Sequence, residues 1–344
     1  MSIDLPVSPS YPAARVVAEQ LHCGFTFEPG PAALERMIDA AFWASLRREE
    51  GVAPTISLAW LPIEATAQPI LLERPIPLDP GALSRLAPAV ERPGIHLGVW
   101  KNDGQLYVWG ATNSLPSDCF VLEVLAPGLL VIKQPTSDES AKYTNVAVLE
   151  GDQVKILSST AVAPPDSPAI IHSLLGSNDE PSILVSLAVS MRKHGRGGSL
   201  LVVPTADGAW LESIVQPIPY LVQPVAFPFL QGVVDRVAGL TAVDGATIVT
   251  ATSDLLAFGA KISRRRNFPR IEQVMASELI AGAVPQVVHP TQLGGTRHLS
   301  AAQFAQDQRD SVVLVASQDG RFTVFAWSKL HEMVQAYRVE TFLV

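Results

Sequence analysis

The pattern of apolar and polar positions in the first third of the chain predicts helices followed by strands. Residues 31–50 carry apolar side chains at helical spacing, with Pro31 at the start and Gly51 just past the end, which indicates a helix. A shorter helix is predicted over residues 81–86. The apolar run over residues 55–61 is typical of a buried strand.

From Gly94 onward, the pattern predicts three successive β-hairpins. The first turn, Asn102-Asp103-Gly104, is a strong tight-turn signal between two alternating segments. The predicted strand pairs are residues 96–100 with 105–109, 120–125 with 129–133, and 146–149 with 154–157. Consecutive hairpins predict a mostly antiparallel sheet. Three prolines between Ala161 and Pro168 then remove the backbone donors that a strand ladder needs, which predicts a linker.

After these prolines, helices alternate with strands and hairpins. We predict helices over 182–194, 233–240 and 301–308, and strands over 199–203, 246–251, 255–261, 311–317 and 321–327. This alternation is typical of an α/β layered domain with a mixed β-sheet flanked by helices. We therefore expect an N-terminal α+β domain with antiparallel hairpins over residues 1–162, a linker over 163–168, and an α/β domain over 169–344.

Composition narrows the functional classes. Hydrophobic residues make up 48% of the 344 residues, which is ample for two cores, and the net charge of -8 argues against a broad nucleic-acid-binding face. Only two cysteines occur, Cys23 and Cys119, without a metal-ligand spacing, which suits a reducing cytosol. The chain lacks a signal-peptide pattern and any apolar run of about 18 residues. We expect a cytoplasmic protein that binds neither nucleic acid nor membrane.

The tripeptide Asp244-Gly245-Ala246 is the first candidate for chemistry. It precedes the predicted strand 246–251; Asp can hold a divalent metal ion, and Gly lets the backbone approach a ligand closely. An ordinary turn before a strand is the alternative interpretation.

The second candidate is the segment Gly294-Gly295-Thr296-Arg297-His298, just before the predicted helix 301–308. Backbone N–H groups at a helix N-terminus, together with a guanidinium fork, form a typical phosphate cradle. The alternative is a simple helix N-cap whose arginine and histidine are solvated.

Taken together and in this order, these motifs resemble those of the diadenylate cyclase domain, a family with a DGA motif and a downstream G-T-R-H-R motif that opens a helix. Ala316-Ser317-Gln318 matches the family's strand near the end, and the run KHGRGGSLLVV matches its opening helix and first strand. The resemblance covers about residues 168–344.

The resemblance implies that two ATP molecules are condensed into cyclic di-AMP and two pyrophosphates, on two domains that meet face to face in a homodimer or larger assembly. It implies that Asp244 binds Mg²⁺ or Mn²⁺ and helps to deprotonate the 3'-hydroxyl. It further implies that Arg297 holds phosphate oxygens and that His298 contacts the phosphate–metal cluster. The implied ATP-binding residues are Gly245, Ala246, Gly259, Gly295, Thr296 and Ser317.

Two departures from the family pattern leave alternatives open. Leu299 stands where the family has its second arginine, and a long connector carries Arg264-Arg265-Arg266. These arginines either replace the lost charge or form a solvated loop. The N-terminal region resembles sensor domains (DACNV type) attached to some bacterial cyclases. Besides an active cyclase, the pattern allows a cyclase-like domain that binds nucleotide or cyclic di-AMP without turnover, or an assembly scaffold.

Overall fold

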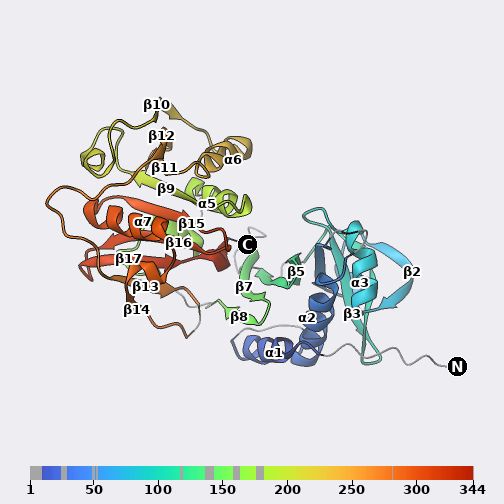
Figure 1. Cartoon of the computed structure of the whole chain (residues 1–344). Helices are drawn as coiled ribbons and strands as arrows, with labels where there is room; N and C mark the ends of the chain where they lie inside the picture. The colour runs from blue at the N-terminus through green and yellow to red at the C-terminus, as the bar shows by residue number, and fades with distance from the viewer. Residues whose placement is uncertain are drawn as a thin grey trace. The chain divides into compact units, whose positions relative to one another are not determined.

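The chain folds into two compact units, residues 1–159 and 160–344, in a computed structural model (Figure 1). The residues described are 10–24, 29–48, 51, 53–116, 119–135, 143–157, 163–175, 182–280 and 282–343. Within these ranges, no helix is both long and apolar enough to span a bilayer.

The first unit is built on an eight-stranded mixed sheet with strand order β2-β4-β3-β1-β5-β6-β7-β8. Its strands are β1 (Ile56–Trp60), β2 (Ile70–Pro77), β3 (His96–Asn102), β4 (Gln105–Thr112), β5 (Phe120–Ala126), β6 (Leu129–Pro135), β7 (Tyr143–Glu150) and β8 (Gln153–Ile156). Strands β1 and β3 pair in parallel, and the three predicted hairpins are present as β3–β4, β5–β6 and β7–β8. Positive φ angles at Asp103 and Gly104 explain the first tight turn.

The helices of the first unit contribute its main apolar core. They are α1 (Pro12–Gly24), α2 (Pro31–Ser45) and α3 (Pro80–Leu86). Buried side chains from all three pack with those of the sheet, including Leu21, Met37 and Leu83. Helix α2 ends at Ser45, earlier than predicted, because Leu46 and the basic residues after it are exposed and have no core to face.

The second unit is built on a nine-stranded mixed sheet with strand order β10-β12-β11-β9-β15-β16-β17-β13-β14. Its strands are β9 (Gly198–Val203), β10 (Tyr220–Ala226), β11 (Ala246–Thr250), β12 (Asp254–Ala260), β13 (Val274–Glu278), β14 (Gln286–Val288), β15 (Val312–Ala316), β16 (Phe322–Ser328) and β17 (Met333–Arg338). The β9–β11 and β13–β17 pairs are parallel. The mixed sheet with flanking helices confirms the predicted fold class.

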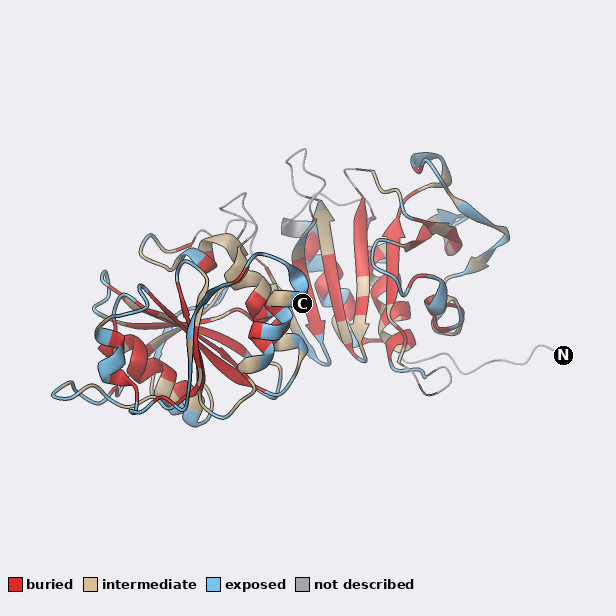
Figure 2. Ribbon diagram, turned by 90° about the horizontal axis from the view of Figure 1, so that it is seen from above, coloured by how far each residue is buried: buried red, intermediate tan, exposed pale blue. Residues whose placement is uncertain are grey.

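Helices cover both faces of this second sheet, so that the unit has three layers. They are α4 (Ala169–Leu174), α5 (Ile183–Lys193), α6 (Gln231–Leu240) and α7 (Thr296–Asp307). One core joins α7 to the sheet through residues such as Phe304 and Val313, and a separate core joins α4, α5 and α6 to it through Met191 and Leu314. Figure 2 shows the central strands buried between these layers.

Residues 163–168, where the prolines predict a linker, pack on the second unit. Ala163 is buried in its core. The carboxylate of Asp166 accepts hydrogen bonds from Ser328 Oγ at 2.5 Å and from the Leu330 backbone N–H at 3.0 Å. These contacts attach the segment to the end of β16.

Candidate functional site

The strand directions of the second sheet bring four separate segments to one end of its central strands. Strands β9 and β11 run parallel, with Ser199 beside Ala246. Strand β12 runs antiparallel to β11, with Ala260 beside Ala246. Strand β15 runs antiparallel to β9, with Ala316 beside Gly198. The segments before β9 and β11 therefore lie at the same end of the sheet as the segments after β12 and β15.

Three residues implied by the sequence motifs, Asp244, Gly245 and Ser317, lie in these four segments, and Arg297 reaches them from the start of α7. We use the name strand-end cluster for Gly197, Asp244, Gly245, Gly259, Lys261, Arg297 and Ser317. Asp244 and Gly245 immediately precede β11, Lys261 immediately follows β12, and Ser317 immediately follows β15. The cluster therefore joins segments that are far apart in the sequence.

Close contacts in the cluster require glycine at two positions, Gly245 directly before β11 and Gly259 on the neighbouring strand β12. Gly245 has a φ of 119°, and a Cβ atom added there would lie 2.5 Å from the carbonyl carbon of Gly259. Gly259 itself has a φ of 64°, and its Cβ would lie 2.8 Å from the ring of Tyr220. Because L-residues disfavour both the dihedral angles and the overlap, these glycines allow the two strands to approach at this point.

Arg297 extends across the loop that precedes β9. A Cβ atom on Gly197 would lie 3.1 Å from Arg297 Nη1 and 3.2 Å from the carbonyl oxygen of Ala316. The first turn of α7 and the end of β15 therefore meet at Gly197.

Asp244 lies within the electrostatic range of two basic residues. Its Oδ2 atom is 2.6 Å from Lys261 Nζ. The hydrogen bond and the positive charge of Lys261 lower the pKa of Asp244, and the charge of Arg297 adds to this effect. The side chain of Asp244 is 92% exposed, so its ionised carboxylate is accessible to a ligand. The structure thus brings Asp244 and Arg297 to the same region.

The loop before α7 places a helix N-terminus at the cluster. Helix α7 begins at Thr296, with Gly295 as its N-cap, several residues earlier than the predicted start. Thr296 is exposed and Arg297 is partly exposed. Unsatisfied N–H groups in the first turn of a helix favour an anion there.

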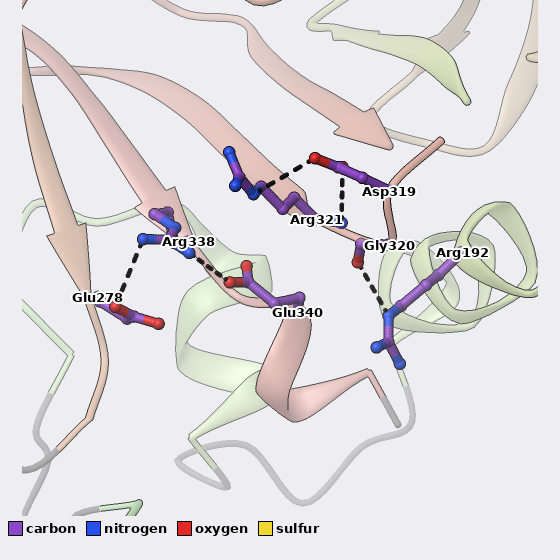
Figure 3. A network of polar contacts seen from close by, with 7 residues as sticks. All are labelled: Arg192, Glu278, Asp319, Gly320, Arg321, Arg338 and Glu340. Atoms are coloured by element: carbon purple, nitrogen blue, oxygen red, sulfur yellow. Dashed lines mark hydrogen bonds and ion pairs between the residues drawn. The ribbon is translucent and has the colours of Figure 1, made fainter. Parts of the chain in front are cut away.

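The turn that carries Ser317 is anchored from two sides. The Ser317 N–H donates to the Arg321 carbonyl at 2.9 Å, and the Gly320 N–H donates to the Ser317 carbonyl at 3.3 Å. Arg192 of α5 donates to the Gly320 carbonyl at 3.2 Å, as Figure 3 shows.

A group of ion pairs lies in the same view. Arg338 lies between Glu278 and Glu340, with nitrogen–oxygen distances of 3.5 and 2.9 Å. These contacts hold the ends of the neighbouring strands in place.

His298 and Leu299 face the protein interior. His298 is 2% exposed, and its ring lies edge-on to Phe325 with the centroids 6.0 Å apart. A Cβ on Gly294 would lie 2.3 Å from His298 Nδ1, so the loop backbone covers the ring. Burial lowers the pKa of His298 and favours the neutral imidazole. Leu299 packs on the core beneath α7. In this conformation, neither side chain is presented to a ligand in solvent.

The arginines at 264–266 lie near the opposite end of α7. Arg265 pairs with Glu212 at 2.7 Å, and its backbone N–H donates to Asp307 Oδ2 at 2.7 Å. Asp307 is the last residue of the twelve-residue helix α7, so it lies roughly 17 Å from the start of that helix. Arg265 therefore does not replace a charge at position 299.

The donor atoms of the cluster fit a divalent cation only in part. Across the ranges that the structure describes, no group of three or more His, Cys, Asp or Glu side chains could hold a metal ion. Asp244 offers one exposed carboxylate. Because protein-bound Mg²⁺ commonly takes one or two carboxylates together with waters and substrate phosphates, this donor fits a metal ion that arrives with a phosphate ligand.

Three residues of this region carried no functional assignment from the sequence. Gly197 lies in a glycine-rich run that is typical of a helix C-cap, and Lys261 is the last residue of a predicted strand. Tyr220 is 51% exposed and stacks on Phe258, with the ring centroids 4.8 Å apart. The proline-rich stretch before Tyr220 offers no local signal for this position.

Comparisons with known proteins identify one segment of the first unit. Residues 26–113 match the family described as "Probable sensor domain DACNV". The matched segment includes the elements from α2 to β4. No curated protein matches the chain.

Two solved structures share limited similarity with the chain. A hypothetical membrane spanning protein from Bacillus cereus is 14% identical, over 48% of this chain and 68% of that one, with a TM-score of 0.29. A double mutant of DacA from Staphylococcus aureus is 16% identical, over 46% of this chain and 83% of that one, with a TM-score of 0.26. Identities and TM-scores this low establish nothing about activity. A function for the second unit is therefore inferred only from the residues of that unit.

Proposed function

We propose that the second unit binds ATP at the strand-end cluster and joins two ATP molecules into cyclic di-AMP, with release of two pyrophosphates. The observation that carries this proposal is the convergence of Asp244 and Arg297, which lie within electrostatic range of each other beside glycine backbone at the strand ends. A carboxylate, a guanidinium and a helix N-terminus in one place form a combination suited to a metal-bound phosphate chain.

Each residue has a distinct part in this proposal. Arg297 and the N–H groups at the start of α7 bind phosphate oxygens. Asp244 holds Mg²⁺ or Mn²⁺, which supplies positive charge against the phosphates. Because its pKa is lowered, Asp244 is a weak base, and its contribution is to orient the 3'-hydroxyl as well as the cation. The exposed ring of Tyr220 offers a surface for the adenine base.

The remaining parts of the proposal concern assembly and control. One cluster holds one ATP, so closing the product ring requires a second copy of the chain. The match of residues 26–113 to a sensor-domain family supports a role for the first unit in binding a signal that adjusts this assembly.

Replacement of Asp244 by Asn tests the proposed activity. We expect Asp244→Asn to reduce cyclic di-AMP formation by about a hundredfold or more, since the cation loses its charged ligand. Product is measured by mass spectrometry after incubation of the full chain with ATP and Mn²⁺. The fold should persist, because the Asp244 side chain is 92% exposed.

Asp310→Asn provides a matched control, because Asp310 is also an exposed aspartate of the second unit. It should retain full activity. Unchanged turnover in Asp244→Asn would remove Asp244 from the mechanism.

The packed side chain at position 299 favours a second candidate, a domain that binds adenine nucleotide or cyclic di-AMP without turnover. Leu299 is partly buried, packs against the core beneath α7 and supplies no charge to a phosphate. Calorimetry with a non-hydrolysable ATP analogue distinguishes the cases. Binding without product formation would support this candidate, and the absence of both would favour an assembly scaffold.

A further inference from the structure

Lys261 is the basic residue in direct contact with Asp244. It follows β12 immediately, and its Nζ atom lies 2.6 Å from Asp244 Oδ2. The two side chains are 51% and 92% exposed. Exposed ion pairs of this kind contribute little to stability, since water solvates both charges well and the side chains lose entropy when they pair. The pair is therefore poorly explained as a structural lock.

The contact does explain how an exposed carboxylate is held when no divalent cation is bound. Lys261 places one positive charge where the proposed metal ion would bind. A divalent cation on Asp244 repels the ammonium group, which must then leave the carboxylate. The lysine stem has four flexible carbons, so its charge can move a few ångströms while the backbone stays in place.

The displaced ammonium group would remain beside the phosphate chain. A triphosphate carries several negative charges, and one divalent cation with Arg297 does not neutralise them fully. Leu299 is an apolar side chain packed against the core, and Arg265 lies near the other end of α7. Lys261, by contrast, is already within the strand-end cluster.

We propose that Lys261 is a phosphate-binding residue that occupies Asp244 until a nucleotide and its metal ion arrive, and then contacts the phosphate oxygens. This inference rests on the proposed function of the second unit. It assigns to the segment directly after β12 a positive charge that Leu299 does not supply on α7. It also predicts opposite effects of Lys261 on the binding of metal ion alone and of nucleotide.

The test compares Lys261→Gln with Lys261→Arg and with the control Lys329→Gln, which removes the same charge at another exposed position of the second unit. Calorimetry on the full chain measures binding of a non-hydrolysable ATP analogue with Mg²⁺, and of Mn²⁺ without nucleotide. We expect Lys261→Gln to weaken analogue binding about tenfold or more, as the loss of a charge-assisted hydrogen bond implies. Mn²⁺ alone should bind more tightly, because its competitor is gone.

The remaining variants and ligands define the outcomes. Lys261→Arg should largely preserve analogue binding, Lys329→Gln should behave as wild type, and adenosine should bind wild type and Lys261→Gln equally because it has no phosphate. Equal analogue affinity in wild type and Lys261→Gln would overturn the role of Lys261 but leave the proposed function in place. If the wild-type chain bound no analogue, the proposed function and this inference would both be overturned.

Discussion

In the first turns of α7, Leu299 packs against the core, whereas the nearby charged residue Arg297 points to the strand ends. The Leu299 side chain is partly buried and contacts the apolar cluster that joins α7 to the sheet, which also contains Ala302 and Val313. The neighbouring Arg297 instead extends over Gly197 at the strand ends. Positions two residues apart on a helix point in different directions, so an arginine at 299 would start from a core-facing position.

Leu299→Arg should therefore lower the free energy of unfolding rather than restore a phosphate-binding charge. We expect a loss of about 1–3 kcal/mol. The guanidinium must either lose its hydration on the core-facing side of α7 or turn towards solvent, which removes the apolar packing at position 299. Urea denaturation measures the change. Leu330→Arg serves as the control, since Leu330 is 65% exposed and should tolerate the charge. Unchanged stability together with higher cyclase activity in Leu299→Arg would contradict this expectation.

Among the elements, the β3–β4 hairpin shows that the first sheet needs a glycine, with no side chain, at position 98. Gly98 of β3 lies directly beside Gly110 of β4, and the indole ring of Trp109 covers Gly98. A Cβ atom at position 98 would lie only 1.9 Å from Trp109 Cζ2. The Trp109 Nε1–H donates to the Leu61 carbonyl at 2.9 Å, so the ring is held in this position by a buried hydrogen bond.

Gly98→Ala should destabilise the first unit by about 1–3 kcal/mol, because the indole must move and strain or lose its hydrogen bond. Thermal or urea unfolding gives the magnitude. Gly239→Ala on α6 is the control, since a Cβ there has no neighbour within 4 Å and alanine favours a helix. Equal stability of Gly98→Ala and wild type would show that Trp109 has room to adjust.

At the scale of the whole molecule, two buried histidines and one partly buried histidine should make stability respond to mild acid. Burial lowers the pKa of His96 in the first unit and of His194 and His298 in the second, all from an ordinary value of 6.5. A lowered pKa in the folded state means that the unfolded chain binds more protons around and below pH 6.5. The free energy of unfolding should therefore fall as the pH decreases through that value.

His96 allows a specific test of this effect, since its Nδ1 atom lies 2.7 Å from Ser57 Oγ in a buried pair. We expect wild type to be less stable at about pH 5.5 than at about pH 7.5, and His96→Asn to show a smaller difference between the two. The readout is the change with pH in urea denaturation, not the absolute stability. His331→Asn, at an exposed position, should keep the wild-type difference. Identical pH dependence in His96→Asn would exclude His96 as a contributor.

Local patterns in the sequence were sufficient to predict much of the secondary structure and fold class. Hairpins were predictable because turns such as Asn102-Asp103-Gly104 require particular backbone angles, and α5, α6 and α7 were predictable from helical spacing. Strands β2 and β10 were not, because their side chains are mostly exposed and each contains a proline, so no apolar alternation marks them. Helix α1 was also absent from the predictions.

The motifs around Asp244 and Arg297 were visible in the sequence by itself, and their residue types suggested metal and phosphate chemistry. Only the tertiary structure decided which residues surround them. The pairing of β9, β11, β12 and β15 brings Lys261 and Gly197 to these motifs, while the packing of α7 turns His298 and Leu299 inward. A sequence pattern reports local backbone geometry and burial, whereas such contacts depend on strand order and direction across segments distant in the chain.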